Sequence, residues 1–511
     1  MDIPIRKRWF SLGNQTAAGI AVLLVALFVR ILGITSRPIW YDEAFAVLFS
    51  EKGLKAMLVG TLTIDPGGAA ADIHPLAYYT LLWGWTKIFG EGLVSVRMLS
   101  ILLGMGIVIL AYLLLRSMFS DVRLALIGGF GVALAPFLVH FSQEVRMYAL
   151  LALSLSGATY AFWQGLHSPK IRWWLLFALC AALAQYTQNL AAFFLIPLAL
   201  TPVFMRRWDK VKMTFLAGMG AVVLYLPWLV QLPAQLIKIQ NSYWVDRPTL
   251  AAMISTLLAF VINLPIDARW LPLALAVSFL VFSLAIYQTF LALRHKLPGA
   301  RRGLWLAYLA FTPPALAFIF SQWRPVYVER AFLPSAVMFW LWLAWALVAT
   351  KLPRVLQVFC QVALAVGIVL GLVTHLTYTG FPYAPYAALD ASLETRLQPG
   401  DVILHSNKLS LLPAFYFDPT LKQEFLADQP GSGSDTLAPA TQQVLGLIEA
   451  PSLDTATKTA GRVWFIIFQK SLDEVAASGL AEDPALAWLN EKFHLENMES
   501  WGSLRLYIFH R

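Results

Sequence analysis

Acidic side chains that could accept a proton lie in two short stretches near the beginning of the chain. WYDE contains Asp42 and Glu43, and DIHP contains Asp72 and His74. A carboxylate next to a bound hydroxyl can act as a general base. We therefore predict Asp42 as the base, with Glu43 or Asp72 as the alternative. Asp42, Asp72 and His74 also have the ligand types for Mg²⁺ or Mn²⁺, although the sequence does not decide whether a metal is used.

Basic side chains that could hold a phosphate occur in later stretches. SQEVRMY contains Glu144, Arg146 and Tyr148, and SQWRPVYVER ends at Arg330. A guanidinium keeps its charge and pairs with two phosphate oxygens, so arginine suits this task. The phosphate-binding candidates are Arg330, Arg146, Arg324, Lys238 and Tyr327.

The elements that position these residues must be membrane helices. The chain has 511 residues, of which 59% are hydrophobic and 13% charged, whereas soluble domains carry about 25% charged residues. Runs such as 17–34, 271–293 and 355–373 approach the ~20 residues that cross a bilayer. The net charge of +9 does not indicate a nucleic-acid partner, because Lys and Arg concentrate in short connections between apolar runs.

Basic connections predict the topology, because they favour the cytoplasmic side. Placing them all there puts the N-terminus in the cytoplasm and the C-terminus outside. The predicted fold is a mainly α-helical polytopic membrane protein with about 11 transmembrane helices. They lie near 17–34, 95–115, 122–140, 148–165, 171–187, 190–205, 213–230, 271–293, 303–320, 331–349 and 355–377. The first run is long, contains Arg30 and lacks a small-residue cleavage site, so we expect a span rather than a secretory signal.

Two shorter apolar segments, 75–90 and 249–262, would reverse the topology if either crossed the membrane alone. We expect them to lie at the outer interface. With this threading the charged stretches all face the outer side, in loops that include a long first one at 35–94. Ionisable groups at membrane depth are costly and often functional, so their shared face predicts one site.

The composition changes after about residue 380. We predict a membrane domain over 1–380 and a soluble extracytoplasmic α/β domain over 381–511. DVILH (401–405), RVWFIIF (462–468) and RLYIFH (505–510) have the pattern of strands, with a helix at 484–493. Residues 428–440 have the composition of a flexible loop. Two cysteines, Cys180 and Cys360, provide neither a disulfide framework nor a zinc motif.

Structural roles also fit the singled-out residues. Asp42 and Glu43 suit a helix N-terminus, Glu144 with Arg146 fits an interfacial ion pair, and Arg330 fits a helix anchor. His74 before a proline is by itself more often structural. Lys238 and Arg324 fit solvated charges. The functional prediction depends on all of them lying on one face.

Several motifs together resemble the GT-C glycosyltransferases, in the branch of protein O-mannosyltransferases and the aminoarabinose transferase of lipid A. They cover the membrane part of the chain: WYDEAFAV, HPLAYYTLLWGWTKIFG, VRMLSILLG, SQEVRMYAL and ERAFLPSAV. The resemblance implies that the family's first-loop acid corresponds to Asp42. It implies that the family's arginines correspond to Arg97, Arg146 and Arg330.

The chain departs from the family pattern in three places. Leu76 follows His74-Pro75 where a second proline is usual, residues 186–189 are Tyr-Thr-Gln-Asn where many relatives carry Thr-His, and Ala331 follows Arg330 where Tyr is common. The second departure puts substrate contacts in doubt, so the identities of the sugar and the acceptor are not carried over.

The resemblance implies an enzyme of the inner (plasma) membrane that uses a polyprenyl-phosphate sugar. The partners would be that donor, a hydroxyl-bearing lipid, glycan or protein acceptor, and the bilayer. We expect one displacement with inversion, since no carboxylate pair suggests double displacement. The alternatives are a transporter or flippase of lipid-linked sugars and a non-catalytic scaffold. A transporter would favour internal repeats and broken helices at the midplane.

Overall fold

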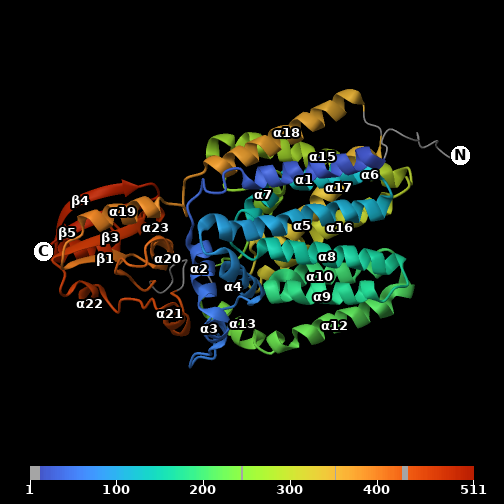
Figure 1. Cartoon of the computed structure of the whole chain (residues 1–511). Helices are drawn as coiled ribbons and strands as arrows, with labels where there is room; N and C mark the ends of the chain where they lie inside the picture. The colour runs from blue at the N-terminus through green and yellow to red at the C-terminus, as the bar shows by residue number, and fades with distance from the viewer. Residues whose placement is uncertain (1–11, 243–244, 351–352, 429–435) are drawn as a thin grey trace. The chain divides into compact units, whose positions relative to one another are not determined.

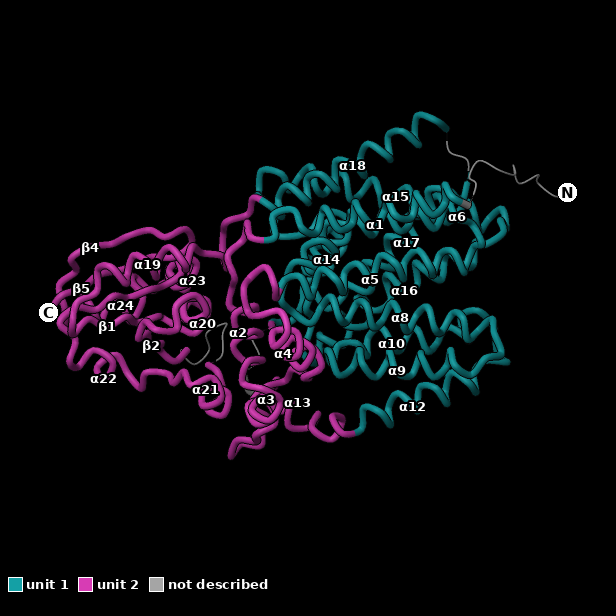
Figure 2. The backbone as a smooth tube through the Cα atoms, viewed as in Figure 1, with its two compact units in different colours: residues 1–34, 97–226, 246–376 teal, residues 35–96, 227–245, 377–511 magenta. Residues whose placement is uncertain are grey.

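The computed structural model describes residues 12–242, 245–350, 353–428 and 436–511. The chain divides into two compact units (Figure 2). Unit 1 contains residues 1–34, 97–226 and 246–376, and unit 2 contains residues 35–96, 227–245 and 377–511. The elements are labelled in Figure 1.

Unit 1 is helical. Its helices are α1 (Leu12–Ile31), α5 (Leu93–Phe119), α6 (Val122–Leu134), α7 (Pro136–Ser142), α8 (Tyr148–His167), α9 (Arg172–Thr187), η1 (Asn189–Ala191), α10 (Ala192–Ala199), α11 (Thr201–Phe204), η2 (Trp208–Lys210), α12 (Val211–Leu229), α14 (Leu250–Val261), η3 (Ala268–Trp270), α15 (Leu271–Arg294), α16 (Ala300–Ser321), η4 (Glu329–Phe332), α17 (Leu333–Ala349) and α18 (Arg354–Thr377). Helices α5 and α12 extend a few residues into unit 2.

Within the described residues, seven helices are long and apolar enough to cross a membrane, or eight if the bent pair α6–α7 is one span. The prediction of a polytopic helical membrane protein is confirmed, and the expected number of eleven spans is approximate. Of the other predicted spans, 148–165 and 171–187 form α8 and α9, and 190–205 is divided among η1, α10 and α11.

The segment expected as one continuous span at 122–140 is instead broken. Helix α6 ends at Leu134, and α7 begins at Pro136 with a bend of 59°. Proline lacks an N–H and disfavours the helical conformation of the preceding residue. Ala135 accordingly has ψ 114°. Pro136 thus ends one helix and starts the next.

Helix α17 lies in the core of unit 1. Fourteen of its seventeen residues are buried, and it packs against α6, α8, α15 and α16. Two of its tryptophans are hydrogen-bonded as well as buried: Trp340 Nε1 donates to Phe260 O and Trp342 Nε1 donates to Thr289 Oγ1, both at 2.9 Å. A polar atom without a partner would be costly in this apolar core.

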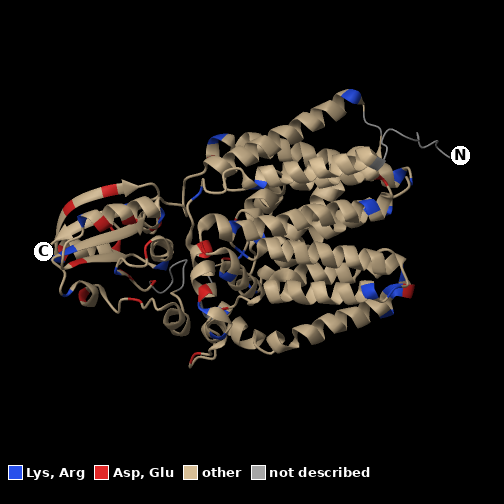
Figure 3. Cartoon of the chain, in the orientation of Figure 1, with Lys and Arg blue, Asp and Glu red and all other residues tan. Residues whose placement is uncertain are grey.

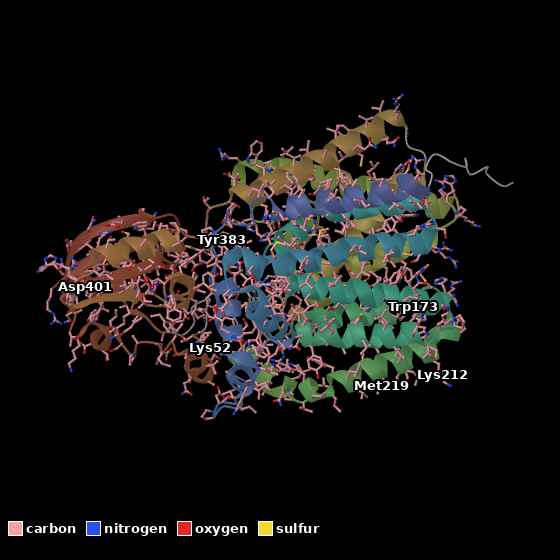
Figure 4. The ribbon with its side chains drawn as sticks, viewed as in Figure 1. Lys52, Trp173, Lys212, Met219, Tyr383 and Asp401 are labelled. Carbon is pink, nitrogen blue, oxygen red and sulfur yellow. The ribbon has the colours of Figure 1, made fainter. Side chains whose placement is uncertain are left out.

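The basic connections of unit 1 lie at one end of its helices (Figure 3). Arg116 and Arg123 flank the α5–α6 turn, and Lys170 lies between α8 and α9. Trp173 on α9 and Lys212 on α12 lie at this same end (Figure 4). This grouping agrees with the prediction that the basic connections lie on one side of the membrane. Which end of the helices faces the cytoplasm stays a prediction.

Unit 2 combines helices of the first predicted outer loop with the C-terminal region. Its helices are α2 (Tyr41–Glu51), α3 (Gly53–Leu62), α4 (Ala77–Phe89), α13 (Leu232–Ser242), α19 (Tyr386–Arg396), α20 (Lys408–Phe417), α21 (Pro439–Leu445), α22 (Leu453–Thr457), α23 (Gln469–Ala477) and α24 (Pro484–Lys492). Helix α2 packs against α4 and α20.

The C-terminal region contains a five-stranded sheet with the order β2-β1-β3-β5-β4. The strands are β1 (Asp401–His405), β2 (Gln423–Phe425), β3 (Arg462–Phe468), β4 (His494–Trp501) and β5 (Leu504–His510). Strands β2, β1 and β3 are parallel, and β5 and β4 are antiparallel to their neighbours. Alternate residues of β3 face two apolar cores, one lined by α19 and α20 and the other by α24.

The three predicted strands and the predicted helix at 484–493 are therefore confirmed, while β2 and β4 were not predicted. Residues 429–435 of the predicted loop lie outside the described residues, and the loop's last positions begin α21. Segments 75–90 and 249–262 are helical, as α4 and α14, but the second half of α14 is buried. Their position at a membrane interface stays a prediction, as does the domain boundary near residue 380.

Candidate functional site

Two stretches of unit 1 are joined by a contact between Arg330 and Tyr148, and we call the four predicted site residues on them the arginine cluster: Glu144, Arg146, Tyr148 and Arg330. Glu144, Arg146 and Tyr148 are each no more than 4% exposed. The Arg330 guanidinium carbon lies 5.3 Å from the centre of the Tyr148 ring. Arg330 comes from η4, Tyr148 begins α8, and Glu144 and Arg146 lie in the turn that precedes α8. The fold thus joins stretches that are about 180 residues apart in the sequence.

The short helix α7 leads directly into this cluster, and its side chains are fixed by hydrogen bonds. The His140 Nδ1 lies 3.0 Å from the Asn263 side-chain nitrogen, and its Nε2 lies 3.7 Å from Glu144 Oε2. Ser100 Oγ donates to the Glu144 backbone oxygen at 2.7 Å. Both the main chain and the carboxylate of Glu144 are thereby held by unit 1.

Gln143 connects α7 to two other helices. Its Nε2 donates to Arg30 O at 2.7 Å and to Leu32 O at 2.9 Å, while its Oε1 accepts from His375 Nε2 at 2.7 Å. The ring centres of His375 and His140 are 4.9 Å apart. The turn that carries Glu144 and Arg146 is therefore attached to α1 and α18.

Arg30 stabilises the break between α6 and α7. It is completely buried, and its guanidinium donates to Ala133 O at 2.7 Å, Val132 O at 3.3 Å and Ser142 Oγ at 3.2 Å. The carbonyls near the end of α6 lose helical partners at the break, and each buried carbonyl left without a donor costs about 1–3 kcal/mol. Arg30 supplies the missing donors.

The remaining candidates of unit 1 have different environments. Arg97 is buried and donates to Ile34 O at 2.7 Å, which gives it a structural contact. Tyr327 is buried, its hydroxyl lies 2.8 Å from Thr256 Oγ1, and burial raises its pKa to about 12. Arg324 is exposed. Tyr327 is therefore a neutral hydrogen-bonding group at neutral pH, and Arg324 faces away from the packed core.

Asp42 and Glu43 lie in the first turn of α2, in unit 2, and both are buried. A carboxylate there interacts favourably with the helix dipole. This agrees with the structural role suggested by the sequence, which is compatible with a catalytic one. The N-cap residue Trp40 makes no side-chain capping hydrogen bond, so contacts from elsewhere must fix the first turn.

Asp72 and His74 form a local pair in unit 2. The ring Nδ1 of His74 lies 2.8 Å from Asp72 Oδ1, which also accepts the backbone N–H groups of Ile73 and His74. Burial opposes the charge on Asp72, but these hydrogen bonds and the His74 ring outweigh it and hold the pKa below its usual value. Lys238 lies on α13, whose Gln235 contacts Asp72 O at 3.5 Å.

With the exception of Lys238, the predicted phosphate ligands thus belong to a different compact unit from the predicted acid. Asp42, Glu43, Asp72, His74 and Lys238 are in unit 2. The arginine cluster, Arg97, Arg324 and Tyr327 are in unit 1. The structure brings the arginine cluster together within one unit; that Asp42 meets it in a single cavity stays a prediction.

Over the described ranges, no group of three or more His, Cys, Asp or Glu side chains is arranged to hold a metal ion. One oxygen of Asp72 already accepts three N–H groups. Metal binding by Asp42, Asp72 and His74 therefore stays a prediction with no geometric support.

Several residues of the network were not found from sequence: His140, Gln143, Asn263 and His375, and the role of Arg30. His140 and Gln143 lie in or beside the segment that was expected to be a continuous span. Arg30 was noted only as a charge inside an apolar run. That charge was the available signal, because an arginine within a span requires buried acceptors.

Comparisons with known proteins agree with this architecture. Residues 73–230 match the family described as dolichyl-phosphate-mannose-protein mannosyltransferase. The undecaprenyl phosphate-alpha-4-amino-4-deoxy-L-arabinose arabinosyl transferase of Pseudomonas aeruginosa (strain UCBPP-PA14) is 28% identical over 236 residues, 44% of this chain. The protein of that name from Pseudomonas paraeruginosa is 27% identical over the same length. The match spans only 41% of the length of these relatives.

Solved structures are similar over nearly the whole chain. ArnT from Cupriavidus metallidurans bound to undecaprenyl phosphate has a TM-score of 0.62 and 14% identity, with 96% of this chain and 98% of that chain covered. The Archaeoglobus fulgidus oligosaccharyltransferase in complex with Zn and sulfate has a TM-score of 0.51 and 12% identity, with 96% and 72% covered. At these identities the likeness concerns the fold.

Proposed function

We propose that this chain, which resembles the GT-C glycosyltransferases of the mannosyltransferase and ArnT-like branch and shares their fold, is a membrane glycosyltransferase. It moves a sugar from a polyprenyl-phosphate donor to a hydroxyl acceptor at the outer face of the inner membrane. The relatives named for undecaprenyl-phosphate sugars support this donor class. The sugar and the acceptor are left open.

The observation that carries the proposal is the arginine cluster, in which Arg146 is buried and Arg330 is half-buried. Arg146 is 3% exposed, and Arg330 lies against the Tyr148 ring. Buried cations are costly and need anionic partners or hydrogen-bond acceptors. In our proposal the guanidinium groups bind the phosphate of the lipid donor and stabilise the negative charge that forms on it. Preorganised charge of this kind is effective where water is excluded.

The chemistry is one displacement. The acceptor oxygen attacks the anomeric carbon, the bond from this carbon to the phosphate oxygen breaks, and polyprenyl phosphate leaves with the electron pair. Asp42 takes the hydroxyl proton, with Glu43 or Asp72 as the alternative base. The attack comes from the side opposite the phosphate, so the product has inverted anomeric configuration. A retained configuration would contradict this step.

The test uses the full-length protein in lipid bilayers with a polyprenyl-phosphate sugar identified by mass spectrometry of lipid that copurifies with the chain. Wild type should transfer the sugar to a hydroxyl acceptor. Asp42→Asn should bind the donor with unchanged affinity but transfer it about 10²–10⁴ times more slowly, as expected for loss of a general base.

The control separates an enzyme from a carrier of lipid-linked sugars. A carrier should move labelled donor between leaflets, should keep this exchange in Asp42→Asn and should make no transfer product. Glu43→Gln and Asp72→Asn, measured in parallel, identify the base. Arg172→Gln, an exposed arginine on α9, should keep wild-type rates.

A further inference from the structure

A buried lysine from the C-terminal region contacts the helix that carries the proposed base. Lys408 is the first residue of α20 and is 3% exposed. Its Nζ lies 3.5 Å from Asp428 Oδ2 and 5.8 Å from the centre of the Tyr41 ring. All three residues belong to unit 2, so a single compact body holds this arrangement.

The position of Tyr41 gives this contact its importance. Tyr41 is the first residue of α2, and Asp42 follows it. The helix has no side-chain cap from Trp40, so a capping interaction does not fix its first turn. Helix α20 packs along α2, and Lys408 reaches Tyr41 from it.

The charge of Lys408 makes the contact specific. Burying an ammonium group is unfavourable unless it is paired, and Asp428 supplies the paired carboxylate. An ammonium near an aromatic face is also attracted to the ring. These two interactions give the lysine one preferred position between Asp428 and Tyr41, whereas an apolar side chain would pack without such a direction.

We propose that Lys408 is a positioning residue for catalysis. Held by Asp428, it fixes Tyr41 and with it the first turn of α2, so that Asp42 has a defined orientation toward the acceptor hydroxyl. This inference rests on the proposed function. It gives the C-terminal region a part in the reaction, beyond a separate soluble domain attached to a membrane enzyme.

The test compares Lys408→Met, Lys408→Arg, Tyr41→Leu and Tyr41→Phe in the full chain. The matched control is Lys470→Met, because Lys470 also lies near a carboxylate and a ring, 3.6 Å from Glu474 Oε1 and 4.4 Å from the Phe381 ring centre, but is exposed. Hydrogen exchange of the α2 amides reports on the first turn independently of activity. Transfer rates and donor affinity are measured on the same samples.

Lys408→Met should accelerate exchange in the first turn of α2 and lower kcat by about 10²-fold, as expected when a catalytic group is displaced by ~1 Å, with donor affinity unchanged. Tyr41→Leu should have the same effects, and the double variant should be no worse than either, because both remove one interaction. Lys408→Arg, Tyr41→Phe and Lys470→Met should stay near wild type.

Unchanged exchange in Lys408→Met would overturn the inference, and so would faster exchange with an unchanged transfer rate. Fully additive effects of Lys408→Met and Tyr41→Leu would overturn it as well. The proposed function fails differently: wild type would then transfer no sugar, while the exchange measurement would still report whether Lys408 fixes α2.

Discussion

Arg330 and Arg324 are six residues apart, yet the fold gives them different surroundings. Arg330 lies against Tyr148 in the arginine cluster, whereas Arg324 is exposed. Sequence alone ranked both as phosphate ligands, because residue type and spacing do not report which side of a loop is packed. The half-buried position of Arg330 beside Tyr148 now favours it over Arg324 as a phosphate ligand.

We predict that Arg330→Met lowers kcat/KM for the lipid donor by about 10²–10³-fold, the usual effect of removing one electrostatic partner of the transition state. Arg330→Lys should restore part of the loss, since it keeps the charge but not the planar fork. Arg324→Met is the control and should change kcat/KM less than threefold. Equal losses in Arg330→Met and Arg324→Met would contradict the distinction.

The raised pKa of Asp390 predicts that the stability of the protein depends on pH. It is buried on α19, and burial together with the Asp418 charge raises its pKa to about 8. The unfolded chain has a carboxyl pKa of about 3.9. Between these values the native state holds a proton that the unfolded state releases, so stability falls as pH rises toward 8 and levels off above it.

Asp390→Asn should therefore raise the thermal unfolding temperature at pH 8 relative to wild type by more than at pH 5. The comparison between variants cancels the contribution of His405, whose pKa is lowered to about 4 by burial. Asp473→Asn, an exposed carboxylate on α23, is the control. A wild-type stability that rises between pH 5 and pH 8 while Asp390→Asn stays flat would refute this prediction.

At the scale of elements, the break between α6 and α7 organises the arginine cluster. We predict that Arg30→Met lowers the stability of unit 1, at about 1–3 kcal/mol for each buried carbonyl left without a donor. It should also slow transfer, because α7 leads into Glu144 and Arg146. Thermal unfolding in bilayers checks the first effect and the transfer assay the second.

Arg172→Met is the matched control, since it removes an exposed arginine that lies over Trp173. Gly104→Ala provides a second perturbation, because a Cβ at position 104 would collide with the Ser142 side chain that Arg30 contacts. If the Arg30→Met protein unfolds at the wild-type temperature and transfers the sugar at the wild-type rate, the proposal that Arg30 stabilises the α6–α7 break is wrong.

The helices and the alternating strands were predictable from sequence, and the polar network was not. Strands β1 and β3 have apolar side chains on both faces and were predicted with their observed ends. Strand β4, HLENMESW, is mostly exposed at the sheet edge, and edge strands need no apolar alternation. The break at Pro136 could not be predicted from the local sequence. The donors for the carbonyls that it frees come from Arg30, which lies more than 100 residues away in the chain.

In the molecule as a whole, the proposed mechanism requires residues of both compact units to act on one donor. The sequence placed the candidate residues on one face through the distribution of basic loops. In the structure these residues belong to two units, with the arginine cluster in unit 1 and Asp42 in unit 2. Helices α20 and α21 of the C-terminal region belong to the unit that contains Asp42 and pack against α2. The role proposed for Lys408 depends on this packing.

Whether the proposed base and a phosphate-binding arginine share one site can be measured by cross-linking Asp42→Cys to Arg330→Cys. The protein for this experiment has Cys180 and Cys360 replaced by alanine. Arg37→Cys with Tyr383→Cys is the positive control, because these side chains are 2.9 Å apart within unit 2. A short bifunctional thiol reagent should link positions 42 and 330, and bound polyprenyl phosphate should slow the reaction. If the control pair is linked and positions 42 and 330 are not, the base and the phosphate-binding arginines do not share a site, and the proposed mechanism is wrong.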